Sequence, residues 1–104
     1  GYAVNTYTMD GFSGEIRLMA GFSPDLNIIN IAVLEQKETP GLGTKMSEPS
    51  FKDQFKGIDP ASFTLKVKKD GGQVDAITAA TISSRAFCDA VGRAWNTLEK
   101  GGLK

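Results

Sequence analysis

The alternation of apolar and charged side chains predicts a β-strand over residues 14–22, in which Ile16 and Leu18 face the same side. A period of two is typical of a half-buried strand. Residues 28–35 form a near-continuous apolar run rich in Ile and Val, which predicts a partner strand buried on both faces. These two segments are therefore expected to pair as a hairpin.

Turn-forming residues separate the expected elements. Residues 23–27 read Ser-Pro-Asp-Leu-Asn, in which Pro24 fixes φ and the side chains of Asp25 and Asn27 can hydrogen-bond their own backbone. Residues 38–43 read Glu-Thr-Pro-Gly-Leu-Gly and interrupt the strand pattern. We expect a hairpin turn at the first place and a loop at the second.

The middle of the chain has weaker signals. A short helix is predicted over residues 50–55, with Ser47 as its N-cap and Gly57 after its end. Residues 63–67 alternate apolar and polar side chains, which predicts a half-exposed strand. Asp-Gly-Gly at residues 70–72 then predicts a turn.

The last element has the clearest pattern, because its apolar residues recur at helical spacing over about four turns. The apolar stripe consists of Ile82, Ala86, Phe87, Ala90, Val91, Ala94, Trp95 and Leu98. Gly101 and Gly102 are expected to end this helix. The predicted fold is a single α+β domain spanning residues 1–104, with an antiparallel sheet, a short middle helix and a long C-terminal amphipathic helix.

Composition excludes several classes of function. The 104 residues include 12 basic and 12 acidic ones, and the only basic group is formed by Lys66, Lys68 and Lys69. That group is expected to be the solvated face of a strand, so nothing supports binding to nucleic acid. No apolar run approaches the length of a transmembrane helix.

The chain contains no histidine and one cysteine. Catalysis by Cys–His or Ser–His–Asp groups is therefore excluded, together with zinc sites of the His/Cys type. We expect no metal site and no residue that catalyses a reaction by itself. Cys88 lies within the predicted long helix, where it is expected to be a small, partly buried hydrophobic side chain.

Residues 75–84 gather hydroxyl side chains where the long helix is predicted to begin. Free backbone N–H groups and the helix dipole favour an anion at such a place. A phosphate there would also receive hydrogen bonds from Thr78, Ser83 or Ser84. The alternative is that Thr78 or Thr81 is simply the helix cap.

Residues 38–43 and the nearby Lys45 form a second candidate segment. Gly41 and Gly43 would let the backbone approach a flat ligand closely. Leu42 offers an apolar tip, and Lys45 offers a charge for a phosphate or a reduced flavin ring. The alternative is a tight surface loop without a ligand.

Together, residues 38–43 and 75–84 resemble the FMN-binding domain of the G subunit of the Rnf electron-transport complex. The C subunit of the sodium-translocating NADH:quinone reductase is a close relative of that protein. The resemblance extends to Asp-Gly-Phe-Ser-Gly-Glu-Ile at residues 10–16 and Phe-Lys-Asp-Gln-Phe at residues 51–55, and so covers nearly the whole chain. One position departs from the family pattern, since Ala79 stands where the family usually has glycine.

The resemblance implies that a flavin transferase attaches FMN to Thr81 through a phosphoester bond. It implies further cofactor-binding positions in both segments. Those positions are Asp75, Thr78, Ala80, Ser83 and Ser84 in one, and Glu38, Thr39, Gly41, Leu42, Gly43 and Lys45 in the other. Backbone groups of residues 39–43 are expected beside the flavin ring, and the start of the long helix beside the phosphate.

The resemblance also implies an electron relay within a larger complex that passes electrons between ferredoxin and NAD and moves sodium ions or protons. Expected partners are the other membrane subunits and the flavin transferase. The parent protein is expected to carry an N-terminal membrane anchor that this chain lacks. The domain would face the periplasmic, extracytoplasmic side of the bacterial inner membrane.

Three alternatives remain open at this point. One is the C subunit of the quinone reductase, or a free-standing domain of another flavinylated system. A second is a degenerate module that assembles the complex without flavin, which the alanine at position 79 keeps in consideration. A third is noncovalent FMN binding with hydride chemistry, which would call for an arginine-rich phosphate pocket.

Overall fold

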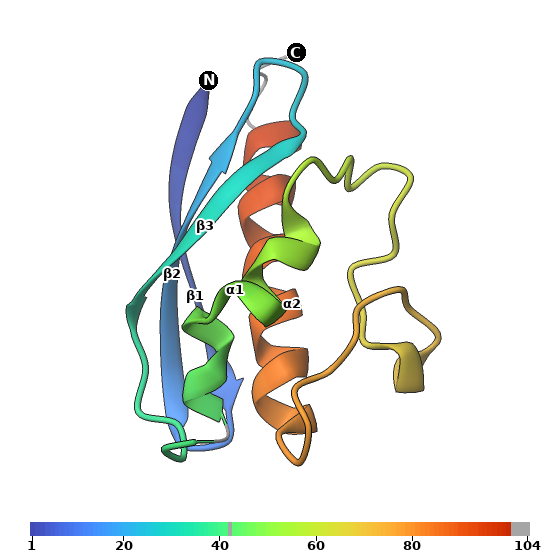
Figure 1. The fold of residues 1–104 in the computed structure, drawn as a ribbon. Helices are drawn as coiled ribbons and strands as arrows, with labels where there is room; N and C mark the ends of the chain where they lie inside the picture. The colour runs from blue at the N-terminus through green and yellow to red at the C-terminus, as the bar shows by residue number, and fades with distance from the viewer. Residues whose placement is uncertain (42, 101–104) are drawn as a thin grey trace.

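A computed structural model describes residues 1–41 and 43–100 and contains two packed layers. One layer is an antiparallel sheet with the strand order β1 (Tyr2–Gly11), β2 (Gly14–Phe22) and β3 (Ile28–Glu35). The other is the long helix α2 (Thr81–Lys100), which lies along one face of the sheet (Figure 1). The α+β fold expected from the sequence is confirmed.

The central strand β2 supplies the apolar face of the sheet. Its alternate residues Ile16, Leu18, Ala20 and Phe22 are all fully buried. In β1, Thr8 is paired with Ile16 and is also fully buried. The period of two that predicted this strand therefore reflects one face packed against α2.

Strand β3 begins and ends where the sequence predicted, but it is not buried on both faces. Ile28 and Ile31 are buried, whereas Ile29 is 54% exposed and Leu34 is 52% exposed. β3 forms an edge of the sheet, and α2 covers only one face. An apolar run can thus occupy a half-exposed strand.

The turn between β2 and β3 is confirmed, with a different side chain holding it. The Oγ atom of Ser23 accepts a hydrogen bond of 3.1 Å from the Asn27 N–H. The Ser23 N–H donates to the Asn27 carbonyl at 2.9 Å, and Leu26 has a left-handed φ of 66°. The side chain that bonds the backbone is therefore that of Ser23, and no such bond from Asp25 or Asn27 appears among the described residues.

Short helical turns follow β3 and contact both β3 and α2. They are η1 (Gly43–Ser47), α1 (Pro49–Lys52) and η2 (Asp53–Phe55). The N-cap of α1 is Glu48, whose side chain makes no capping bond, so the prediction of Ser47 as the cap is wrong. Gly57 follows with a φ of 75°, as expected of a residue after a helix end.

Aromatic contacts hold this middle segment against the long helix. The ring of Phe87 lies 5.0 Å from the rings of both Phe51 and Phe55, measured between centroids. All three side chains are buried. Because α1 is too short to be stable alone, these contacts fix its position.

The strand predicted over residues 63–67 does not form. Val67 makes one isolated bridge with Val74, and η3 (Lys68–Asp70) follows directly. The backbone bonds locally across the predicted turn, since the N–H of Lys68 donates to the Val74 carbonyl at 3.0 Å. Exposed and less exposed side chains do alternate over residues 63–67. The backbone of this segment, however, hydrogen-bonds to residues just after it and does not join the sheet.

Helix α2 begins at Thr81 and buries the predicted stripe with two exceptions. Ile82 is 46% exposed and Trp95 is half-buried, so Ile82 was wrongly assigned to the core. Cys88 is almost completely buried, more so than expected. The predicted stop at residues 101–102 lies outside the described residues.

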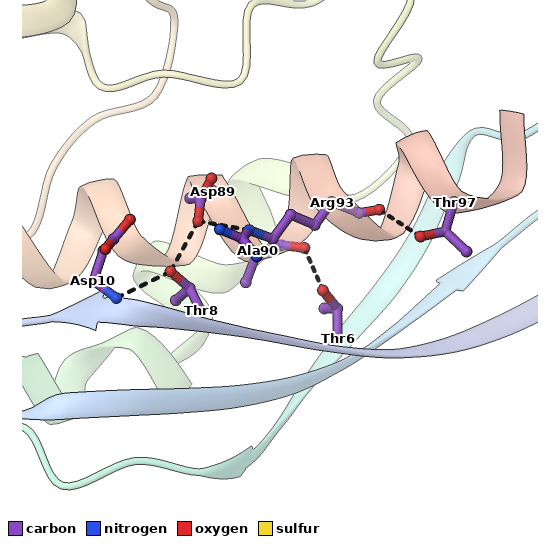
Figure 2. A network of polar contacts seen from close by, with 7 residues as sticks. All are labelled: Thr6, Thr8, Asp10, Asp89, Ala90, Arg93 and Thr97. Carbon is purple, nitrogen blue, oxygen red and sulfur yellow. Dashed lines mark hydrogen bonds and ion pairs between the residues drawn. The ribbon is translucent and has the colours of Figure 1, made fainter. Parts of the chain in front are cut away.

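Polar contacts join β1 to α2 (Figure 2). The hydroxyl of Thr8 donates to Oδ2 of Asp89 at 2.8 Å, and that of Thr6 donates to the Ala90 carbonyl at 2.9 Å. Arg93 donates to the same Asp89 oxygen at 3.0 Å. These contacts fix the first strand along the last helix. No helix in the described part of the chain is long and apolar enough to cross a membrane.

Candidate functional site

A cavity of about 350 Å³ lies at the start of α2, where three distant segments of the chain meet. Phe12 comes from the turn between β1 and β2, and Thr39 and Gly43 come from the loop after β3. Residues 79–83 form the remaining wall. The two segments singled out in the sequence are thus brought together, in a volume within the range of roughly 300–1,000 Å³ usual for cofactor sites.

The turn before α2 determines where the helix begins. The Ala80 N–H donates to the Ile77 carbonyl at 3.0 Å, and Ala79 adopts a left-handed φ of 60°. The Ala80 carbonyl then accepts from the Ser84 N–H at 3.0 Å. Ala80 is therefore the N-cap, so the alternative in which Thr78 or Thr81 caps the helix is wrong.

Thr81 is the first helical residue, and its partly buried side chain lines the cavity. Within residues 1–41 and 43–100, the N–H groups of Thr81, Ile82 and Ser83 have no hydrogen-bond partner, and neither does the Thr81 hydroxyl. Free amides at a helix start carry partial positive charge and favour an anion. A hydroxyl and three amides suited to an anion therefore share one cavity wall.

The two serines that follow already have protein partners. The fully buried Ser84 hydroxyl accepts from the Ile77 N–H and donates to the Ala80 carbonyl, both at 2.9 Å. The Ser83 hydroxyl donates to Oε1 of Glu38 at 2.6 Å. Ser84 thus stabilises the turn that presents Thr81, while Ser83 joins α2 to the loop after β3.

Glu38 is only 4% exposed, and its carboxylate accepts three hydrogen bonds. Besides Ser83, its carboxylate accepts the N–H of Phe12 and the N–H of Ser13, each at 2.8 Å. Figure 1 shows the loop after β3 beside the turn between β1 and β2. The carboxylate joins both of these segments to the start of α2.

The glycines of the loop have different roles. A Cβ atom on Gly43 would lie 2.5 Å from Glu38 Cβ and 2.6 Å from Ser83 Oγ, so only glycine fits there. Gly41 has a left-handed φ of 77°, and its N–H donates to the Thr44 hydroxyl at 3.0 Å. The close approach at Gly43 is thus to the protein itself. Leu42 lies outside the described residues.

Lys45, Asp75 and Thr78 line a second cavity of about 230 Å³. The side chain of Gln54 bonds both backbone groups of Asp75, donating to its carbonyl at 2.9 Å and accepting from its N–H at 2.7 Å. Lys68 forms an ion pair of 2.7 Å with the Asp75 carboxylate. Residues 75–81 therefore run between the two cavities, and only their last part reaches the cavity that holds Thr81.

The cavity beside Thr81 has no charged side chain among the described residues that line it. Arg85, one turn along α2, is bound to Asp70 by two hydrogen bonds of 2.7 and 2.8 Å. That contact lowers the pKa of Asp70 below its ordinary value and raises the pKa of Arg85. The first basic residue of α2 is therefore already paired, and no arginine lines the cavity among the described residues.

Three lining residues were not identified from the sequence as site residues, namely Phe12, Ala79 and Ile82. Ala79 had been noted only as a departure from the family pattern. Phe12 is 65% exposed, and Ile82 had been expected in the apolar stripe of the long helix. The signal for Phe12 was its place in residues 10–16, a segment that the resemblance to the family includes. The side chain of Ile82 is exposed because it lies in the first turn of α2, one residue after the helix begins.

Residues 11–96 match the model of the FMN-binding domain family, and the chain belongs to that family. It is 45% identical over 92 residues to the G subunit of the ion-translocating oxidoreductase complex of Methanosarcina acetivorans, covering 88% of this chain and 47% of that relative. The corresponding G subunit of Pasteurella multocida is 41% identical over 96 residues, covering 86% and 47%. The chain thus spans about half the length of the curated relatives it matches.

The fold is similar to that of a solved structure. The crystal structure of Shewanella oneidensis NqrC superposes with a TM-score of 0.65 at 26% sequence identity. The match covers 91% of this chain and 46% of that one. The fold that brings the walls of the cavity together is therefore similar in the two proteins.

Proposed function

We propose that this member of the FMN-binding domain family carries FMN on Thr81 and relays electrons within an ion-translocating oxidoreductase complex of the Rnf type, as part of its G subunit. The observation that carries the proposal is the position of Thr81. Thr81 lines a cavity that is also lined by Thr39 and Gly43, beside three amides that have no hydrogen-bond partner among the described residues.

The residues present fit FMN. The free N–H groups at the start of α2 suit a phosphate, and the apolar walls of Phe12 and Ile82 suit a flat ring system. The cavity has a volume of about 350 Å³ and is open at its rim. Bound here, the flavin would supply the redox chemistry, while the protein would orient it and exclude water.

The attachment is a phosphoryl-group transfer without a change of oxidation state. The Thr81 Oγ1 atom forms a bond to the FMN-side phosphorus of FAD, and the pyrophosphate bond to that phosphorus breaks. AMP leaves, and the threonine proton passes to a base of the transferase. The product is a phosphodiester with a single negative charge, which three amides can bind without a cationic side chain.

The assignment to the G subunit is supported by the curated relatives, since those at 41–45% identity are named as G subunits of the ion-translocating oxidoreductase complex. The resemblance to NqrC, at 26% identity, favours as a second candidate the C subunit of the sodium-translocating quinone reductase. Either assignment implies other proteins of the complex as partners. A membrane anchor and a location outside the cytoplasm belong to the same proposal.

The test is the intact mass of the domain after co-expression with a flavin transferase, followed by fragment mapping. We expect added mass equal to one FMN phosphodiester, located in the fragment that contains Thr81. Thr81→Ala should remain unmodified. Thr64→Ala is the matched control, because Thr64 is an exposed threonine that lines neither cavity.

Two other outcomes would change the assignment. A flavinylated Thr81→Ala variant would refute the attachment at this residue. An unmodified wild-type domain, with another member of the family modified in parallel, would instead favour a module that assembles the complex without flavin.

A further inference from the structure

We infer that Glu38 is a positioning residue, which does not bind the cofactor but fixes the Phe12 turn and the first turn of α2 as walls of the cavity. The role of Glu38 beside a cofactor rests on the proposed function, whereas its hydrogen bonds do not depend on FMN. It reassigns Glu38, which the resemblance placed among the cofactor-binding positions.

The carboxylate has little capacity left for a ligand. Oε1 accepts from the Ser83 hydroxyl and the Phe12 N–H, and Oε2 accepts from the Ser13 N–H. The residue is only 4% exposed. An anionic carboxylate also repels a phosphate, so direct contact with that group would be unfavourable.

The three donors come from segments that no other described side chain joins in this way. Phe12 and Ser13 form the turn between β1 and β2, and Ser83 lies in the first turn of α2. Phe12 and Ser83 both line the cavity. Since an exposed turn has few packing contacts of its own, the position of the Phe12 ring depends on this carboxylate.

The close packing at Gly43 supports the same interpretation. A Cβ there would lie 2.5 Å from Glu38 Cβ and 2.6 Å from Ser83 Oγ. The loop backbone at Gly43 therefore packs directly against the hydrogen-bonded pair of Glu38 and Ser83. The walls formed by the turn, the loop and the helix therefore meet at one buried side chain.

Glu38→Gln tests the inference, because glutamine has nearly the same shape but only one acceptor oxygen. Three donors converge on this side chain, and the carbonyl oxygen of glutamine can accept only two of them. The third donor would face the NH₂ group. Glu48→Gln is the matched control, since it removes the same charge from an exposed side chain that makes no capping bond.

The first measurement is amide hydrogen exchange of Phe12 and Ser13 in the domain without flavin. We expect at least one of these amides to exchange about tenfold faster or more in Glu38→Gln, because a bond to a charged acceptor is lost. Glu48→Gln should leave both rates unchanged. Equal rates in the wild type and Glu38→Gln would overturn the inference.

The second measurement is the visible circular dichroism of the flavin after modification by the transferase. This signal reports the asymmetric surroundings of the ring, which a merely structural residue would not alter. We expect a changed spectrum in Glu38→Gln and an unchanged one in Glu48→Gln. If Glu38→Gln does not fold, Ser83→Ala should change the spectrum in the same direction to a smaller extent, and a wild-type spectrum there would overturn the inference.

These measurements separate the inference from the proposed function. If the wild-type domain takes up no flavin, the proposed function fails, while the exchange rates still decide the role of Glu38. If the wild type is modified and Glu38→Gln matches Glu48→Gln in both measurements, only the inference fails.

Discussion

At the scale of single residues, the conformation of Ala79 is the most unusual feature of the site. It is one of two non-glycine residues with positive φ among the described residues, and it occupies the turn that presents Thr81. A left-handed conformation costs an L-residue roughly 1–2 kcal/mol. The left-handed bend before Thr81 is therefore formed here by an alanine.

Ala79→Gly is expected to stabilise the domain by about 1 kcal/mol, since the relief of backbone strain exceeds the added entropy of the unfolded chain. The measurement is the midpoint of urea unfolding. Ala76→Gly is the control, because Ala76 is exposed on the same segment and its φ is not positive. It should lose about 0.4–1 kcal/mol. A loss of stability in Ala79→Gly would contradict the strain argument.

Cys88 provides a second prediction at this scale. Burial, with a smaller contribution from the negative charge of Asp70, raises the pKa of its thiol from 9.0 to about 12. At pH 8 the reactive thiolate is therefore about a thousandfold less populated than in a free cysteine. We expect no labelling of the native domain by iodoacetamide and complete labelling in denaturant. Rapid labelling of the native domain would show that the helix opens readily at this position.

At the scale of elements, the short middle helices depend on aromatic packing against α2. Phe55 is 1% exposed, and its ring lies 5.0 Å from that of Phe87. Phe55→Ala is expected to destabilise the domain by about 3–5 kcal/mol, because a cavity would remain between the middle segment and α2. Urea unfolding measures the loss. The exposed Phe12→Ala should stay within about 0.5 kcal/mol, and an equal loss there would contradict the assignment of the core.

The elements that could be predicted from the sequence are those whose pattern reflects burial on one face. β2 and α2 are such elements, and β3 was found through its Ile and Val content. β1 was not predicted, because its inward residues include the polar Thr6 and Thr8. Their hydroxyl groups can face α2 because they donate hydrogen bonds to it. The prediction of a strand over residues 63–67 was wrong, because hydrogen bonds across the following turn satisfy the backbone of this segment.

At the scale of the whole molecule, the site exists only when the chain is folded. The motif segments 38–43 and 75–84 could be paired from the sequence by resemblance, and Thr39 and Gly43 do share a cavity with Thr81. The roles of Glu38 and Ser84 could not be predicted, because their partners are set by tertiary contacts. Phe12 joins the site through the sheet, which brings the turn after β1 beside the start of α2.

A flavin on Thr81 should therefore stabilise the entire domain. Its ring and phosphate would contact the Phe12 turn, the loop and α2 together, contacts that the unfolded chain cannot make. We expect a higher thermal midpoint in the flavinylated domain, by about 4–8 °C for each kcal/mol of favourable contact. Thr81→Ala treated with the same transferase should keep the midpoint of the unmodified protein. If the flavinylated and unmodified domains unfold at the same temperature, the flavin does not occupy the cavity and Thr81 serves only as a point of attachment.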